Sequence, residues 1–360
     1  MSVPRGARVV RLATRGSPLA LVQAETVARL CEAQDPAVRA ERVVVRTEGD
    51  RRRSEELDRI GGQGLFAKEV QAAVLDGRAD VAVHSAKDLP ARTPEGLVLA
   101  AVPERADPRD ALVGACLDAL GPGALVATGS ARRRAQLANL RPDLGFVGLR
   151  GNMAARLERA QRGGVAAVVA AAAALDRLGW ADRIAERLEP TQCLPQAGQG
   201  ALALECRKDD AVCRELLARV DARDAHRALD AERAFLRALG AGCALPVGAL
   251  ARPAAGGVRD GGVRDDGERD DGERDDGERD DGARELLELE GMLASGDGRV
   301  VVRARLSGDD PEALGAALAR MLVREHGASS LAELAGLEER DELARRDEPG
   351  AGSGRMSGFR

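Results

Sequence analysis

A strand, a tight glycine turn and a serine-capped helix occur twice in this chain, about a hundred residues apart. The first copy is residues 9–18 and the second is residues 124–133. Ser17 and Ser130 stand where a serine caps the following helix, and the free backbone N–H groups of such a helix start favour an anion. Good capping alone explains either copy equally well. Together, two such units predict two similar α/β lobes that face each other across a cleft.

Short apolar runs alternate with helical patterns along the first half of the chain. The expected strands are residues 9–13, 42–47, 81–84 and 97–102, and the expected helices are 18–31, 67–76 and 131–139. Strands that alternate with helices indicate an α/β sheet with covered faces. After residue 221 the order becomes a helix (225–239), three strand-like runs (244–251, 285–293 and 299–306) and a final helix (311–326). That order is typical of a small α+β domain.

The composition limits both the core and the partners of the chain. The 360 residues are 44% hydrophobic but include no Tyr, one Trp and four Phe, so the cores must consist of Ala, Val and Leu. So few aromatic rings argue against a single-strand nucleic-acid binder, which needs stacking platforms. Residues 259–281 hold twelve acidic residues and five arginines, a local charge of −7; since the whole chain carries −5, the rest carries about +2. A nearly neutral body also argues against nucleic-acid binding.

Residues 256–282 repeat a charged five-residue unit and lack apolar anchors, so we expect a disordered, solvated insertion. Disorder is also expected in the tail, residues 345–360. No segment reads as a signal peptide or a membrane span, and the six cysteines form no CxxC pair. We therefore expect reduced thiols, a cytoplasmic location and no membrane partner. No metal is expected either, because the three histidines have no paired spacing.

Polar residues follow the expected strand at 81–84. Lys87 and Asp88 lie at the strand end where open α/β sheets bind ligands. The two residues either form a surface ion pair or lie in a cleft, where the carboxylate of Asp88 stabilises a developing cation. Five arginines also lie at or just after expected strand ends: Arg15, Arg132, Arg133, Arg150 and Arg156. Any one of 51 arginines fits a solvated surface charge, but five at one crevice predict a polyanionic ligand.

Glycine-rich loops at residues 61–66 and 194–200 bracket this cleft. Their spacings match neither a Walker A motif nor a dinucleotide fingerprint, so nucleotide binding is not expected. Cys243 lies in a third such loop, residues 240–246. It is either a thiol that a ligand can approach closely or, like most lone cysteines, an inert small hydrophobe.

Seven short motifs occur in an order and spacing that resemble the porphobilinogen deaminase (hydroxymethylbilane synthase) family. They are residues 13–20 (ATRGSPLA), 61–66 (GGQGLF), 84–90 (HSAKDLP), 108–111 (PRDA), 149–152 (LRGN), 198–200 (GQG) and 242–243 (GC). The resemblance runs from about residue 8 to residue 252 and resumes more weakly after the acidic insertion. The chain departs from the usual family pattern at Gln63, Gly129, Gly148 and Ala241.

This resemblance implies three domains. Domain 1 (residues 6–103, completed by 197–220) and domain 2 (104–196) are expected to be α/β lobes like those of periplasmic binding proteins. The chain is expected to cross back into domain 1 near Pro195. Domain 3 (221–340) is expected to be a small α+β domain, and the protein is expected to be a monomer.

The resemblance also implies the chemistry: an enzyme of heme biosynthesis that joins four porphobilinogen units, with loss of ammonia, into the linear tetrapyrrole hydroxymethylbilane. A dipyrromethane cofactor, assembled from two substrate units, is expected on Cys243 through a thioether. Asp88 is the implied catalytic residue, since a carboxylate beside the cation left by ammonia lowers the barrier. The implied cofactor contacts are Lys87, Asp88, Ser130, Arg132, Arg133, Arg150 and Gly151. The implied substrate contacts are Arg15, Ser17, Phe66, Arg150, Arg156 and Gln199.

A protein of a different class remains as the alternative: a two-lobed anion-binding protein without catalysis. The two lobes and the arginines fit that class. The loop around Cys243 and the lack of a signal segment do not.

Overall fold

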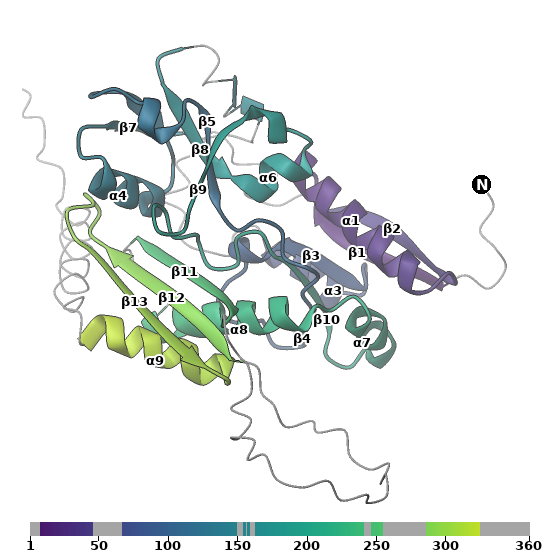
Figure 1. Cartoon of the computed structure of the whole chain (residues 1–360). Coiled ribbons are helices and arrows are strands. Elements are labelled where there is room, and N and C mark those ends of the chain that lie inside the picture. Colours follow the sequence, from purple (N-terminus) through teal and green to yellow (C-terminus); the bar gives the residue numbers. More distant parts are fainter. Residues whose placement is uncertain are drawn as a thin grey trace, which may run out of the picture.

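The computed structural model describes residues 8–45, 67–149, 154–155, 157–158, 163–240, 246–254 and 286–324. These residues form two five-stranded mixed sheets and one three-stranded antiparallel sheet, each covered by helices (Figure 1). The acidic insertion expected at 256–282 and the tail expected at 345–360 lie outside the described residues.

The first sheet, with its helices, forms what we call lobe 1. Its strands lie in the order β2-β1-β3-β10-β4 and are β1 (Arg8–Arg15), β2 (Val38–Val45), β3 (Val81–Ser85), β4 (Leu97–Ala101) and β10 (Leu202–Arg207). β1 runs parallel to β2 and β3, whereas β10 is antiparallel to β3 and β4. The helices are α1 (Pro18–Gln34), α3 (Lys68–Leu75) and α7 (Ala211–Ala218). Two apolar clusters cover the two faces of the sheet, one with α1 and α7 and the other with α3.

The second sheet forms lobe 2 and has the same plan. Its order is β7-β6-β8-β5-β9, with β5 (Asp110–Gly114), β6 (Leu125–Ala127), β7 (Gly145–Val147), β8 (Ala167–Ala171) and β9 (Ile184–Leu188). Again three strands are parallel and a fourth, β5, is antiparallel to both of its neighbours. The helices are α4 (Ala131–Leu140) and α6 (Ala172–Arg177), with the short 3-10 helices η3 (Leu117–Ala119) and η4 (Ala181–Arg183). The expected pair of similar α/β lobes is confirmed.

The chain crosses between the lobes twice, because β10 returns to the first sheet after the second is complete. The outward crossing follows β4, and the return crossing precedes β10. The two segments contact each other directly, since the Ala106 N–H donates to the Gly200 carbonyl at 3.2 Å. Gly200 has φ +87°, and a Cβ there would lie 2.4 Å from the Ala106 oxygen. The close contact therefore requires glycine at this position.

A third domain follows, with α8 (Arg223–Leu239), β11 (Val247–Pro253), β12 (Leu287–Ala294), β13 (Val301–Gly308) and α9 (Pro311–Arg324). The strands form an antiparallel sheet in sequence order. Both helices pack on it around the fully buried ring of Phe235. The expected small α+β domain is confirmed. Among the described helices, none combines the length and apolarity needed to cross a membrane.

Candidate active site

Asp88 lies at the carboxyl end of β3, in a single 3-10 turn, η2 (Ala86–Asp88). β1 runs parallel to β3, so both strands end at the same edge of lobe 1. Arg15, at the end of β1, and Ser17, the N-cap of α1, lie at this edge. The three side chains line one hollow together, and the Asp88 residue is exposed. The structure thus brings together three of the residues expected to bind substrate or catalyse its reaction.

A buried polar layer underlies this hollow. His84, whose residue also lines the hollow, has Nε2 3.2 Å from Oε2 of Glu205 on β10. The amide of Gln71 donates to the same Glu205 oxygen at 2.8 Å. Burial by itself raises the pKa of Glu205, but His84 and Gln71 more than offset that effect and lower it. Gln71 and Glu205 were not identified from the sequence. Their contacts hold His84 at the hollow that Asp88 also lines.

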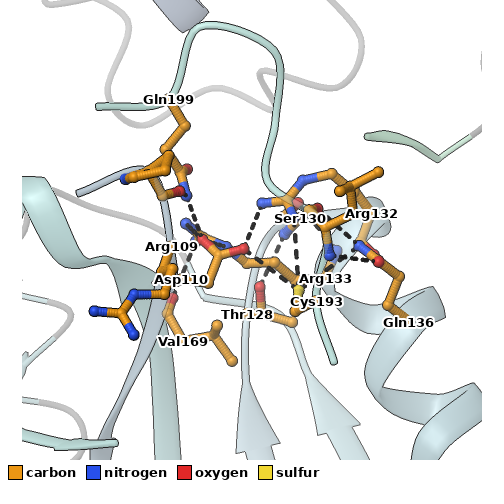
Figure 2. Close-up of polar contacts among 12 residues, drawn as sticks. Arg109, Asp110, Thr128, Ser130, Arg132, Arg133, Gln136, Val169, Cys193 and Gln199 are labelled. Atoms are coloured by element: carbon orange, nitrogen blue, oxygen red, sulfur yellow. Dashed lines mark hydrogen bonds and ion pairs between the residues drawn. The ribbon is translucent and has the colours of Figure 1, made fainter. Parts of the chain in front are cut away.

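In lobe 2, Asp110 lies between the guanidinium groups of Arg132 and Arg133 (Figure 2). Its Oδ2 is 2.8 Å from Arg132 Nη2, and its Oδ1 is 2.7 Å from Arg133 Nη2 and 2.9 Å from Arg133 Nε. All three side chains are buried. Burial raises the pKa of Asp110, but the two arginine charges outweigh it and hold that pKa well below its usual range. Asp110 therefore stays ionised and fixes both arginines.

The remaining donors of the two arginines differ. Arg133 Nη1 donates to the Val169 carbonyl at 3.1 Å, and its backbone N–H is capped by Ser130 Oγ. Arg132 Nη1 donates to the Leu194 carbonyl at 2.5 Å. Arg132 Nε is buried and has no hydrogen-bond partner among the described residues. One buried donor of Arg132 is thus not used by the described residues, and it lies in the first turn of α4, after the Ser130 cap.

Gln199, on the return crossing, joins the two clusters. Its Nε2 donates to Asp110 Oδ1 at 2.9 Å and to the Pro108 carbonyl at 2.8 Å, and its Oε1 accepts from Lys87 Nζ at 3.3 Å. Gln199 is completely buried. Burial of the Lys87 ammonium, reinforced by the nearby charge of Arg133, lowers its pKa to about 8. Lys87 thus faces lobe 2, whereas its neighbour Asp88 faces the hollow of lobe 1.

The described cysteines are all free thiols: Cys31, Cys116, Cys193, Cys206 and Cys213. Cys193 is the one beside the site, and its Sγ donates to Asp110 Oδ2 at 3.4 Å. Burial and the Asp110 charge raise the pKa of Cys193 to about 12. A thiol held protonated in this way is a poor nucleophile. Cys193 is therefore a hydrogen-bond donor to Asp110.

The expected site residues that the structure brings together are Arg15, Ser17, Lys87, Asp88, Ser130, Arg132, Arg133 and Gln199. Phe66, Arg150, Gly151, Arg156 and Cys243 lie outside the described residues. Asp110 was missed as a site residue, although it lies in the motif at 108–111. Its only sequence signal was an acidic residue opening an apolar run. Among the described residues, no three His, Cys, Asp or Glu side chains lie close enough to hold a metal ion.

Comparison with known proteins gives matches along most of the chain. Residues 10–215 match the family model "Porphobilinogen deaminase, dipyromethane cofactor binding domain", and residues 227–259 match "Porphobilinogen deaminase, C-terminal domain". A porphobilinogen deaminase from Syntrophobacter fumaroxidans is 41% identical over 85% of this chain and 91% of the relative. One from Xanthomonas axonopodis pv. citri is 44% identical over 90% of this chain and 99% of the relative.

The similarity to solved structures is more distant. The periplasmic VFT2 domain of BvgS from Bordetella pertussis is 18% identical, with a TM-score of 0.35, over 59% of this chain and 86% of that domain. The methionine-binding protein MetQ is 13% identical, with a TM-score of 0.36, over 59% of this chain and 89% of that protein.

Proposed function

This chain belongs to the porphobilinogen deaminase family, and from that premise we propose that Asp88 and the cations around Asp110 carry out its reaction. The protein is a hydroxymethylbilane synthase, EC 2.5.1.61, of tetrapyrrole biosynthesis. Its reaction joins four porphobilinogen units into a linear tetrapyrrole with the release of ammonia.

One observation carries this proposal: Lys87 of lobe 1 and the Arg132–Arg133 pair of lobe 2 share one buried network through Gln199 and Asp110. Two guanidinium groups contact one carboxylate, and Lys87 joins the network through Gln199, so the cations outnumber the carboxylate. Porphobilinogen carries an acetate and a propionate, and arginine binds carboxylates in a defined, bidentate geometry. A positively charged junction between two lobes suits a substrate that adds two carboxylates with each unit.

The residues present fit a dipyrromethane cofactor, whose carboxylates need cationic partners. The buried Arg132 Nε has no partner among the described residues, and the adjacent helix start is capped by Ser130. We assign the cofactor carboxylates to Lys87, Ser130, Arg132 and Arg133, together with Arg150 and Gly151, and the thioether to Cys243. When bound, the cofactor supplies the pyrrole carbon to which the first substrate unit is joined.

Asp88 acts at the hollow of lobe 1. When the amino group of the aminomethyl side chain leaves as ammonia, the methylene carbon stays on the ring, and positive charge develops on that carbon and the conjugated pyrrole. A carboxylate next to that charge lowers the barrier, and it also accepts hydrogen bonds from the pyrrole N–H. Arg15 and Ser17 line the same hollow, and we assign the substrate carboxylates to them. From the family resemblance we add Phe66 and Arg156 as further contacts.

We assign Gln199 a positioning role in place of the substrate contact expected from the sequence. It is completely buried, and its amide is occupied by Asp110, Pro108 and Lys87. Its hydrogen bonds therefore position Lys87 directly and the Arg132–Arg133 pair through Asp110.

The three sheets support the division into residues 6–103 with 197–220, 104–196 and 221–340. We propose that the enzyme works as a monomer in the cytoplasm. The free thiols of the described cysteines suit a reducing compartment. Light scattering coupled to size-exclusion chromatography measures the oligomeric state directly. A mass of twice 37.8 kDa would contradict the proposal of a monomer.

Intact mass of the purified protein, beside a Cys243→Ser variant, tests the assignment of the cofactor. We expect an excess equal to two porphobilinogen units less two ammonia in the wild type and none in the variant. Thiol titration after unfolding gives a second readout: five of the six cysteines react in the wild type, because the thioether blocks one. Cys116→Ser is the control and keeps the excess mass.

No excess mass after incubation with porphobilinogen, with six reactive thiols, would overturn the proposal. A two-lobed anion-binding protein without catalysis would then describe the chain better. Excess mass that persists in the Cys243→Ser variant would instead move the attachment to another residue.

A further inference from the structure

The turn between β12 and β13 lies directly on α4, the helix whose first turn includes Arg132 and Arg133 (Figure 1). Asn139 Nδ2 donates to the Gly298 carbonyl at 3.0 Å, and Arg134 Nη2 donates to the Gly296 carbonyl at 3.2 Å. Gly298 has φ +77°, and a Cβ there would lie 2.3 Å from the Ala135 oxygen. The turn of the third domain therefore packs against the backbone of α4 as closely as glycine allows.

Arg303 on β13 extends this contact into the interior of lobe 2. Its Nη2 donates to Gln136 Oε1 at 2.7 Å, and its Nη1 donates to the Pro190 carbonyl at 2.9 Å. Gln136 is buried and lies one helical turn after Arg132. A side chain of the third domain thus holds a buried amide of lobe 2.

Gln136 in turn hydrogen-bonds to the backbone of Leu194, which also binds the Arg132 guanidinium. The Leu194 N–H donates to Gln136 Oε1 at 2.7 Å, and Gln136 Nε2 donates to the Leu194 carbonyl at 3.1 Å. The same carbonyl accepts from Arg132 Nη1 at 2.5 Å. Hydrogen bonds therefore connect Arg303 to Gln136, Gln136 to Leu194, and Leu194 to the Arg132 guanidinium. Buried networks that are well satisfied are rigid, so losing one member loosens its neighbours.

We propose that Arg303 is a positioning residue for the reaction. It couples the docking of the third domain on lobe 2 to the placement of the Arg132 guanidinium. The carboxylate-binding site is therefore fully formed only when the domain that includes Cys243 is docked. This inference rests on the proposed function, in which Arg132 binds the carboxylates of the cofactor.

The strand itself offers a matched control. Arg305 lies two residues beyond Arg303, and its side chain pairs with Glu288 and Glu290 within the third domain. Arg303→Met and Arg305→Met remove the same charge from the same strand. Only Arg303→Met breaks the contact with Gln136.

The test compares the rate at which apoenzyme gains the cofactor mass from porphobilinogen, together with KM and kcat of the holoenzyme. We expect Arg303→Met to slow cofactor gain and to raise KM, each by about tenfold, the size of one hydrogen bond to a charged group. kcat should change by less. Arg303→Lys should restore part of the loss, and Arg305→Met should match the wild type.

A double-mutant cycle separates positioning from general destabilisation. In an Arg132→Met background, Arg303→Met should cause no further loss, because its target is already gone. In an Arg15→Met background, the loss should add in full. Equal losses in both backgrounds would overturn the positioning role.

A glycine pair tests the same docking without removing a charge. Gly298→Ala should displace the turn and reproduce the slow cofactor gain. Gly296→Ala should not, because a Cβ there has open space around it. Gly77, like Gly298, has a positive φ, but a Cβ there would have open space around it. Gly77→Ala therefore controls for backbone strain alone.

The outcomes distinguish the two proposals. If Arg132→Met leaves cofactor gain and KM unchanged, the proposed function of Arg132 fails. If Arg132→Met impairs both while Arg303→Met and Gly298→Ala behave like their controls, the proposed function stands and the coupling is wrong.

Discussion

The side-chain amide of Gln199 donates to the carboxylate of Asp110 across 2.9 Å, which ties the return crossing of the chain to the first residue of β5. The same amide group accepts from Lys87 of lobe 1. One glutamine therefore links the residue next to Asp88 with the carboxylate that fixes Arg132 and Arg133. The two halves of the site meet at the place where the chain passes from one lobe to the other.

Replacing Asp88 by Asn should remove the negative charge beside the developing cation. We expect turnover to fall by about 10²- to 10³-fold, the usual loss of one group aimed at transition-state charge. The exposed Asp118→Asn should leave turnover unchanged. Product formation measured alongside intact mass separates the chemical step from cofactor loading. Near-normal turnover in Asp88→Asn would remove its catalytic role.

Asp110→Asn should be strongly destabilising, because two buried guanidinium groups would lose their shared counter-ion. Breaking a buried pair of this kind costs about 3–5 kcal/mol. The native pKa of Asp110 lies below its unfolded value, so the stabilisation is present above the unfolded value and is lost as pH falls through the native one. Urea unfolding at pH 7 measures the cost. Asp143→Asn, which breaks a surface pair with Arg141, is the control, and an equal loss in both variants would contradict the account.

Lys87 should impose a pH dependence on the gain of the cofactor by the apoenzyme. Its ammonium carries charge below a pKa of about 8 and loses it as pH rises through that value. We expect the rate at which apoenzyme gains the cofactor mass from porphobilinogen to fall above pH 8 in the wild type, and the fall to move to higher pH in Lys87→Arg, which stays charged. Taking the ratio of the two profiles cancels the titration of the substrate itself. Profiles that coincide, or a shift caused equally by the exposed Lys208→Arg, would show that Lys87 is not the titrating group.

Glu232 should be the main anchor of the two crossings. Its buried carboxylate accepts from Arg105 Nη1 at 2.6 Å, from the Gly198 N–H at 2.6 Å and from the Ala251 N–H at 2.8 Å. Glu232→Gln removes the charge and turns an N–H toward existing donors, so we expect a loss of about 3–5 kcal/mol. Hydrogen exchange should accelerate at Gly198.

The matched control for that measurement is Glu215→Gln, on the exposed face of α7, where Glu215 pairs with Arg219. Its unfolding midpoint in urea should stay near the wild-type value. A Glu232→Gln variant that is as stable as this control would show that the crossings hold together without the carboxylate.

The sequence placed the local elements well, because helix caps and apolar periodicity act within a few residues. α1 starts at Pro18 after the Ser17 cap, and α4 starts at Ala131 after the Ser130 cap, as predicted. β2 begins at Val38, four residues before the predicted start, because its register with β1 extends the pairing from Arg8 onward. β5, β7 and β9 were not predicted. β7 has only three residues, and β5 and β9 pair antiparallel with each other, so these strands depend on their neighbours in the sheet.

The sequence by itself determined the family, the two capped helix starts and the acid and base residues available to the site. The tertiary structure decided which acidic and basic side chains pair with each other. Arg132 and Arg133 were predicted as ligand contacts from the sequence, but their shared pairing with Asp110 and the hydrogen bond from Gln199 to that carboxylate were not predicted. The reason is physical: capping depends on adjacent residues, whereas an ion-pair partner depends on strand order. That order brings Asp110, Arg132 and Gln199 together from three separate segments of the chain.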